Sequence, residues 1–256
     1  MRKESERFAD STILEGMVSL RGLLRGQKAG VNDRRILEVY YDEGRLGKIG
    51  KEVAFLRHEG ERQGFSVSSL PSEEIDRLAV GGTHGGIIAK CSDRKIPSIQ
   101  EIDPSLFPFA VMLEGIEDPY NFGYAVRSLY ASGVDLLVLN ERNWMSAAGV
   151  VARSSAGTSE EMPMVTADPS LAVDEFRRKG FQIVCADANT EEAVDHADLP
   201  FPLLLVIGGE RRGISSAVLQ KADKVVRLLY GREFQGALSA ASAAAILAYV
   251  IAGKNR

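Results

Sequence analysis

The chain has 256 residues, 45% hydrophobic and 26% charged, which is typical of a globular protein long enough for two domains. No apolar run approaches the roughly 20 residues of a membrane span, and the first residues are too charged for a signal peptide. We therefore expect a cytoplasmic protein with no membrane partner. Residues 1–100 carry a net charge of +2 and residues 101–256 a net charge of −6, so the overall −4 neither supports nor excludes nucleic acid.

The front part of the chain predicts a small α/β domain. Apolar runs at 36–41 and 86–91 indicate strands. Pro71 and the acidic residues after it predict the start of a helix over 72–78. We place this domain at residues 1–95, a linker at 96–107 and a second domain at 108–256.

The second domain alternates strands with helices more regularly. Strands are predicted at 109–113, 136–139, 181–185, 203–207 and 225–229. Helices are predicted near 121–132, 170–179, 215–222 and 238–252. This alternation favours a mostly parallel sheet that is covered on both faces.

Cysteine and histidine are too sparse to predict a metal site. Cys91 and Cys185 fall in apolar runs and are expected to be buried thiols rather than a disulfide. The three histidines are scattered along the chain.

Two helices carry specific expectations. The helix at 121–132 places Phe122, Ala125, Val126, Leu129 and Tyr130 on one apolar stripe and Arg127 on another face. Arg127 is then either a ligand-facing residue or an ordinary solvated arginine. The helix at 238–252 is apolar nearly all round, which predicts a buried core helix or a dimer interface.

The segment 208–213, Gly-Gly-Glu-Arg-Arg-Gly, follows a continuously apolar strand and precedes a helix. Such a glycine turn commonly binds a small ligand in α/β proteins. It has neither the glycine spacing of a dinucleotide fold nor the Lys-Ser or Lys-Thr of a P-loop. Since Glu210 would repel phosphate, we expect a cation or a polar adenosine here rather than a pyrophosphate.

Five segments, in order along the chain, resemble the motifs of the SpoU (TrmH-type) RNA ribose 2′-O-methyltransferases of the SPOUT superfamily. Asp118-Pro-Tyr-Asn-Phe-Gly123, with Arg127 and Gly133-Val-Asp135, resembles the first motif, 203–215 the second and 237–247 the third. Ser155-Ala-Gly157 with Met162-Pro-Met-Val165 resembles a segment between the first two. His84-Gly-Gly resembles a His-Gln-Gly signature, with Gly85 in place of glutamine.

The resemblance implies an α/β fold with an N-terminal L30e/L7Ae-like substrate-binding domain and a C-terminal SPOUT domain whose parallel sheet carries a deep trefoil knot. It also implies S-adenosylmethionine as cofactor, rRNA or tRNA as partner, and a homodimer formed through the knotted domain. The activity implied is methylation of a ribose 2′-hydroxyl.

The implied site residues follow from the motif positions. The catalytic set is Arg127, Asn121, Glu210 and Ser239. The cofactor set is Ile207, Gly208, Gly209, Gly213, Leu228 and Leu238. RNA contacts are expected from His84, Arg21 and Arg25. Because a guanidinium keeps its proton at neutral pH, we prefer Arg127 as the group that orients the nucleophile and stabilises developing oxyanion charge over a role as general base.

The third motif departs from the family pattern. Its Ser-Leu-Asn is Ala237-Leu238-Ser239 here, and the Ile-Pro-Met before it is Leu228-Leu229-Tyr230. Two alternatives to an active RNA methyltransferase therefore stay open. One is an RNA-binding or ribosome-associated protein with weakened catalysis, and the other is an enzyme that uses the same cofactor on a substrate other than RNA.

Overall fold

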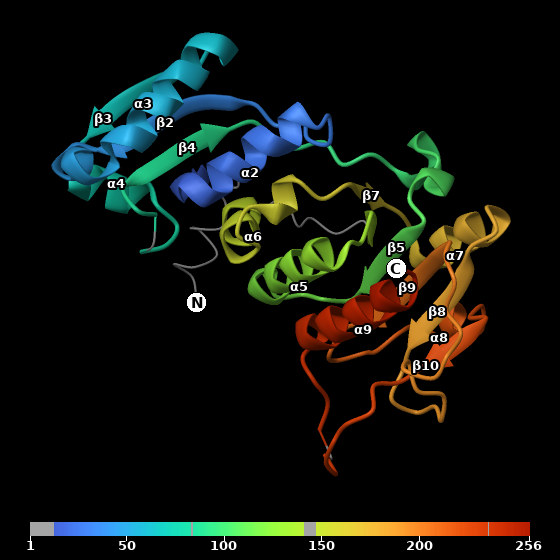
Figure 1. The fold of residues 1–256 in the computed structure, drawn as a ribbon. Coiled ribbons are helices and arrows are strands. Elements are labelled where there is room, and N and C mark those ends of the chain that lie inside the picture. The colour runs from blue at the N-terminus through green and yellow to red at the C-terminus, as the bar shows by residue number, and fades with distance from the viewer. Residues whose placement is uncertain (1–12, 83, 141–146, 235) are drawn as a thin grey trace. The chain divides into compact units, whose positions relative to one another are not determined.

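A computed structural model describes residues 13–82, 84–140, 147–234 and 236–256 (Figure 1). The charged N-terminal run therefore lies outside the described residues. The chain forms two compact units. One consists of Met1–Lys95 together with Asn143–Glu161, and the other of Ile96–Arg142 together with Met162–Arg256.

The first unit is built on a mixed four-stranded sheet in the order β1-β4-β2-β3. Its strands are β1 (Ile13–Glu15), β2 (Ile36–Asp42), β3 (Ser66–Leu70) and β4 (Ile87–Cys91). Its helices are α2 (Gly16–Lys28), η1 (Glu43–Arg45), α3 (Leu46–Gln63), α4 (Ser72–Leu78), α6 (Ala148–Ser154) and η5 (Thr158–Glu160). The strands predicted at 36–41 and 86–91 and the helix at 72–78 are confirmed to within one residue.

Segment 147–161, which comes late in the chain, completes the first unit. The added Cβ of an alanine at Gly22 in α2 would lie 2.3 Å from the carbonyl oxygen of Gly157, so the two backbones are in direct contact. Arg153 in α6 forms an ion pair of 2.6 Å with the buried Glu15. The continuous domain bounds expected from the sequence assign this segment to the second domain, and those bounds stay a prediction.

The second unit contains a parallel six-stranded sheet in the order β10-β8-β9-β5-β6-β7. The strands are β5 (Phe109–Glu114), β6 (Leu136–Leu139), β7 (Met164–Thr166), β8 (Gln182–Ala186), β9 (Leu203–Gly208) and β10 (Lys224–Val226). The helices are η2 (Ile99–Glu101), η3 (Pro104–Leu106), α5 (Pro119–Ser132), α7 (Pro169–Arg178), α8 (Ser216–Leu219) and α9 (Ala240–Lys254). The predicted α/β class, with a second parallel sheet, is confirmed; the knot stays a prediction.

Both long crossover helices of this sheet begin at an Asp-Pro pair. Asp118 accepts a hydrogen bond from the backbone N–H of Tyr120 at 2.7 Å, and Asp168 accepts from Ser170 and Leu171 at 3.0 Å. In each helix the proline occupies the first turn, where its missing N–H has no cost. Gly133 ends α5 with a φ of 92°. Residues of the first family motif thus also determine where α5 begins and where it ends.

The helices cover both faces of the parallel sheet. One face, which presents Ala110 and Met112 of β5, packs on Phe176 of α7 and Val218 of α8 in a single hydrophobic core. On the other face α9 packs against β9 and α5, and Figure 1 shows α5 and α9 side by side. Strands buried on both faces explain why β5 and β9 are apolar without alternation.

Three predicted elements differ from the structure. The last strand ends at Val226 rather than 229, because the next residues pair with the segment after β8: Arg227 donates its N–H to the Glu192 carbonyl at 2.9 Å. Helix α8 covers only Ser216–Leu219 of the 215–222 expected. Tyr130, expected on the buried stripe of α5, is 39% exposed, whereas the other four members are buried.

Helix α9 is buried on one face only. Ala244, Leu247 and Ile251 are inaccessible, but Tyr249 is 64% exposed and Ile246 44% exposed. The two cysteines are free and buried, as predicted. No helix in the described ranges is long and apolar enough to span a membrane.

Candidate active site

The site lies at the carboxyl ends of the strands in the second unit. The chain leaves β5 toward β6 and β7 on one side, whereas β9 and β8 lie on the other side of β5. The neighbouring ends of β5 and β9 therefore form a topological switch point, where the loops diverge and leave a crevice for a ligand. The loops that leave these two strands are Gly115–Asp118 and Gly209–Ile214.

The glycine turn after β9 is held by close backbone packing. A Cβ at Gly208 would lie 2.3 Å from the carbonyl carbon of Gly213, and a Cβ at Gly209 would lie 2.2 Å from the carbonyl oxygen of Gly115. The N–H of Gly213 donates to the Gly209 carbonyl at 3.0 Å. The lack of a side chain at Gly208 thus admits the turn's own backbone, and contact of Gly208 with the cofactor stays a prediction. The turn after β9 is thus stacked on the loop after β5.

Glu210, at the tip of this turn, joins two helices. Its Oε1 accepts hydrogen bonds from Asn121 Nδ2 at 3.4 Å and from the N–H of Ala240 at 3.3 Å. Asn121 lies in the first turn of α5, and Ala240 is the first residue of α9. The positive N-terminus of a helix favours a carboxylate at this position. The three family motifs therefore meet at this one carboxylate, above a small pocket of about 180 Å³.

A larger pocket of about 770 Å³ opens on the other side of the turn, at the ends of β8, β9 and β10. All six residues expected to bind the cofactor line it, together with Glu210. They are Ile207, Gly208, Gly209, Gly213, Leu228 and Leu238. The volume lies within the range of about 300–1,000 Å³ that small-molecule sites occupy.

The pocket also contains polar and aromatic residues that the motifs did not assign to the cofactor. Asp187 and Asn189 line it just after β8, and Asp187 accepts a hydrogen bond from the N–H of Asn189 at 2.7 Å. Tyr230 and Phe234 line it with their rings 5.5 Å apart, edge to face. The signal for Asp187 was available, because a polar residue that directly follows a buried parallel strand lies at the ligand-binding edge.

Arg127 lies apart from these groups. Its side chain is exposed on α5, lines neither pocket and makes no hydrogen bond or ion pair with the described residues. It follows Asn121 by six residues, which corresponds to a rise of about 9 Å along the helix axis and to about 1.7 helical turns. The two side chains therefore project from different faces of α5. Asn121 and Glu210 thus contact each other rather than Arg127.

Ser239 caps α9. Its Oγ accepts a hydrogen bond from the N–H of Ser242 at 3.2 Å, and its hydroxyl donates to Ser242 Oγ at 3.0 Å. A serine at the N-cap satisfies a backbone donor that the helix leaves free. Ser239 therefore stabilises the start of α9, next to Ala240, whose N–H donates to Glu210.

Comparison with known proteins identifies the family. The model of the SpoU rRNA Methylase family matches residues 108–249, more than half of the chain. The chain belongs to the SpoU family. This match confirms the family and the enzyme class that the motifs predicted.

Relatives of this SpoU protein cover most of its length. YacO of Bacillus subtilis, assigned to the TrmH family of tRNA/rRNA methyltransferases, is 26% identical over 230 residues, 88% of this chain and 90% of YacO. An uncharacterized tRNA/rRNA methyltransferase of Mycolicibacterium vanbaalenii is 30% identical over 203 residues, 76% of this chain and 63% of the relative.

Two solved structures have the same fold as this SpoU protein. An RNA 2′-O ribose methyltransferase is 21% identical with a TM-score of 0.77, covering 99% of this chain and 95% of its own. The SpoU methyltransferase AviRb from Streptomyces viridochromogenes, in complex with AdoMet, is 19% identical with a TM-score of 0.76 and covers 98% of both chains.

The residues that the SpoU resemblance assigns to RNA lie in the first unit. His84 is 4% exposed, with its Nε2 3.0 Å from Asp76 Oδ1 and its Nδ1 accepting from the Gly86 N–H at 3.1 Å. Arg25 forms two hydrogen bonds with Glu161, at 2.6 and 2.7 Å. Arg21 lies over the ring of Phe55, 5.9 Å from its centroid. All three have partners inside the protein, and their contact with RNA stays a prediction.

Proposed function

We propose that this protein methylates the ribose 2′-hydroxyl of a nucleotide in tRNA or rRNA, with S-adenosylmethionine as the methyl donor. One observation carries the proposal: the six cofactor residues expected from the family motifs line one pocket beside the Asn121–Glu210 pair. Family membership and the AdoMet complex of a protein with the same fold support the cofactor.

The residues of the pocket fit this cofactor chemically. Ile207, Leu228 and Leu238 supply apolar walls for an adenine ring, and the carboxylate of Asp187 can accept hydrogen bonds from ribose hydroxyls. Glu210, at the border of the two pockets, supplies negative charge to the neighbourhood of a sulfonium. The same lining includes Arg227 and Arg232, so the pocket as a whole is not acidic, and the negative charge that a sulfonium would meet is local to Glu210.

When bound, S-adenosylmethionine supplies an electrophilic methyl group for in-line displacement. The protein must align the 2′-hydroxyl with that group and stabilise the charge that grows on the oxygen. Glu210 and Asn121 fix the end of α5 relative to the pocket. In this proposal the exposed guanidinium of Arg127 meets the incoming RNA, orients the ribose and a flanking phosphate, and stabilises the developing oxyanion.

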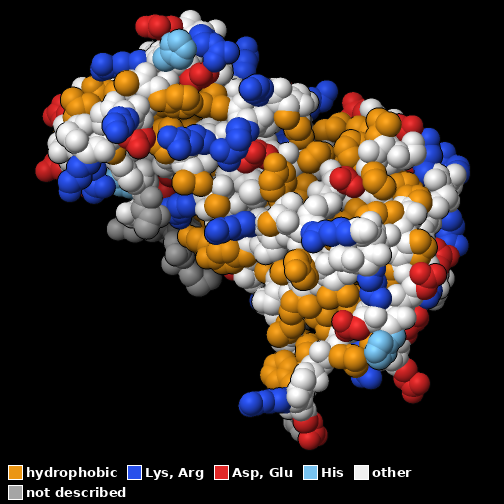
Figure 2. Space-filling view, viewed as in Figure 1, with side chains coloured by type: hydrophobic (Ala, Val, Ile, Leu, Met, Phe, Trp, Pro, Cys, Tyr) orange, Lys and Arg blue, Asp and Glu red, His pale blue; other side chains and the backbone are white. Residues whose placement is uncertain are grey.

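A homodimer through α5 and α9 is part of the proposal. Hydrophobic side chains gather over these helices in Figure 2, and the exposed ones include Tyr124 and Tyr130 of α5 and Ile246 and Tyr249 of α9. Such a patch is typical of an interaction surface. Sedimentation velocity on the wild type and on a Tyr249→Glu variant tests it: the wild type should sediment as a dimer and the variant as a monomer.

The function is tested by titrating the protein calorimetrically with S-adenosylmethionine and then assaying methyl transfer to unmodified rRNA and tRNA transcripts. An Arg127→Ala variant should bind the cofactor as the wild type does, because Arg127 does not line the pocket, but should not methylate RNA. Absence of binding by the wild type at millimolar cofactor would contradict the proposal. Equal activity of the variant would remove Arg127 from the mechanism.

An RNA-binding protein with weakened catalysis is the second candidate. Among the described residues, Arg127 makes no hydrogen bond or ion pair with Asn121 or Glu210, and the third motif has lost its amide at Ser239. Cofactor binding and RNA binding without methyl transfer to any rRNA or tRNA transcript would favour this candidate.

A further inference from the structure

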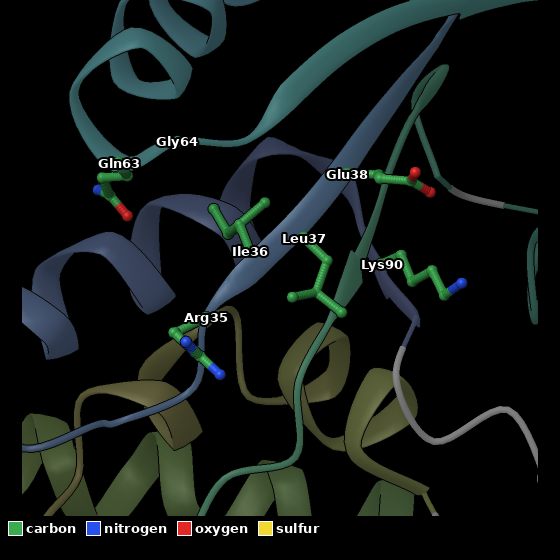
Figure 3. Close-up of a pocket in the computed structure, with 7 residues that line it drawn as sticks. All are labelled: Arg35, Ile36, Leu37, Glu38, Gln63, Gly64 and Lys90. Carbon is green, nitrogen blue, oxygen red and sulfur yellow. The ribbon is translucent and has the colours of Figure 1, made fainter.

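The first unit has a groove of about 420 Å³ whose chemistry is distinct from that of the pockets described above (Figure 3). It forms where β2 extends beyond the start of β3, since the pairing of these strands begins only at Glu38 and Ser66. The end of α3, at Gln63 and Gly64, borders the uncovered part of β2. Helix α4 packs farther along the sheet, against Tyr40 and Leu70.

A β-bulge turns an apolar side chain into this groove. The register of β2 against β4 shifts between Ile36, which faces Cys91, and Glu38, which faces Lys90, so Leu37 has no partner across the ladder. Ile36 is 6% exposed, but Leu37 is 44% exposed and lines the groove. Bulges re-aim side chains in this way and recur beside functional sites.

Two cations without partners flank Leu37. Arg35 and Lys90 are exposed, and their side chains make no hydrogen bond or ion pair with the described part of the chain. Other arginines of this unit are paired: Arg25 with Glu161, Arg45 with Asp42 and Arg62 with Glu59. The backbone N–H of Arg35 donates to Ser92 Oγ at 2.8 Å, which fixes the base of its side chain.

The one acidic group of the groove is already engaged. The carboxylate of Glu38 accepts a hydrogen bond from the Tyr40 hydroxyl, which raises the pKa of Tyr40. Lys90 faces Glu38 in the register without an ion pair between the two side chains. In Figure 3 both project to the same side of the strands. Gln63 adds a side-chain amide at the rim, and its Nε2 donates to Glu59 Oε2 at 3.3 Å, which leaves the amide oxygen as an acceptor. The groove therefore combines an apolar surface, polar hydrogen-bonding groups and two free positive charges.

We propose that this groove binds one unpaired nucleotide of the substrate RNA, away from the nucleotide that is methylated. Arg35 and Lys90 contact the phosphates on its two sides, and Leu37 packs against the base. Oε1 of Glu38, which Tyr40 leaves free, and the amide oxygen of Gln63 accept hydrogen bonds from the base edge. An RNA strand matches this set because it alternates anionic phosphates with apolar base faces. The inference rests on the proposed function for the identity of the RNA, but binding is measurable without catalysis.

The test uses the full chain and two double variants that remove the same charge. Arg35→Gln with Lys90→Gln changes the groove, and Lys48→Gln with Lys51→Gln changes two exposed lysines of α3 outside it. Fluorescence anisotropy measures binding of a labelled single-stranded decaribonucleotide and of unmodified tRNA. The groove variant should bind the oligonucleotide about tenfold more weakly, and its salt dependence should fall by about 1.4 in slope, roughly 0.7 per phosphate contact. The control should stay within about twofold of wild type.

A Leu37→Ser variant separates the base contact from charge, since it should weaken binding without changing the salt dependence. Equal weakening by both double variants would overturn the proposal, as would a wild type that binds neither RNA. Competition by uridine monophosphate at the same concentration as the oligonucleotide would also overturn it, because the site would then accept a free nucleotide rather than a strand. Unchanged circular dichroism and urea unfolding in all variants show that the first unit folds, which cofactor binding cannot report because its pocket lies in the second unit. RNA binding that depends on the groove, without methyl transfer, would refute the proposed function but not the proposal that the groove binds RNA.

Discussion

The Nε of Arg34 lies 3.1 Å from Oε2 of Glu160, and both side chains are almost completely buried, at 2% and 4% exposed. Glu160 Oε2 also accepts a hydrogen bond from Asn32 at 2.7 Å, and Arg34 donates to the Ser92 carbonyl at 2.8 Å. This pair ties the segment after α6 to the loop before β2, across 126 positions of sequence. The first unit is therefore completed by residues that come after the first methyltransferase motif.

Glu160→Gln should destabilise the first unit strongly. It leaves the Arg34 guanidinium buried without a counter-charge, and breaking a buried pair in this way costs about 3–5 kcal/mol. Urea unfolding followed by circular dichroism measures the effect. Glu161→Gln is the matched control, because its partner Arg25 is 55% exposed and such pairs contribute at most about 1 kcal/mol. Equal losses in the two variants would contradict a special role for the buried pair.

Gly209→Ala should weaken cofactor binding by roughly 30- to 150-fold, which corresponds to a loss of about 2–3 kcal/mol of binding free energy. The new Cβ would lie 2.2 Å from the Gly115 carbonyl oxygen, so the turn must move away from the loop after β5. Calorimetric titration with S-adenosylmethionine measures this. Gly231→Ala is the control, since its Cβ would meet no atom within 4 Å. Normal affinity in Gly209→Ala would show that the turn does not shape the pocket.

Ser239→Ala should lower the free energy of unfolding by about 1 kcal/mol, the usual cost of a lost N-cap. Ser239→Asn restores the family residue and should keep the stability, because asparagine caps helices as well as serine does. Thermal unfolding of the three proteins gives the comparison. If Ser239→Ala keeps its stability but loses methyl transfer, the serine acts in catalysis rather than as a cap.

The buried thiols predict a loss of stability in alkali. Burial, with a contribution from the charge of Glu114, raises the pKa of Cys185 from 9.0 to about 12, and burial raises that of Cys91 to the same value. Below pH 9 the thiols are protonated in both the folded and unfolded states, so their full contribution is present. Between pH 9 and 12 only the unfolded state loses the protons, and stability falls.

Urea unfolding at pH 7.5 and pH 10.5 measures this loss, and a Cys185→Ala variant should show a shallower fall than the wild type. In the folded wild type neither thiol should react with Ellman's reagent at pH 8. Rapid modification of either cysteine would show that its thiol is accessible and ionised.

Much of the second unit could be predicted from the residues. The apolar runs at 109–113 and 203–207 form strands buried on both faces, as predicted, and the Asp-Pro pairs mark where α5 and α7 begin. The same local logic failed at Val225–Leu229, where four of the five residues are apolar. There the strand ends early because the segment after β8 takes over the pairing, and Leu228 then lines a pocket.

The family motifs also singled out the residues of the pocket, but not how they are held. Nothing in the sequence near Gly209 indicates that it packs against Gly115. Asp187 was missed because it belongs to no motif, although it follows β8 directly.

By itself the sequence determined the α/β class and the family, and it predicted six of the residues that line the larger pocket, because these depend on local patterns and motifs. Only the tertiary structure decided that Glu210 joins Asn121 to the start of α9, that Arg127 lies away from both, and that Glu160 completes the first unit. It also decided that Arg35, Leu37 and Lys90 share one groove. The physical reason is that pairing, burial and the loss of a partner are properties of distances between residues far apart in the chain, and strand register and helix packing set those distances.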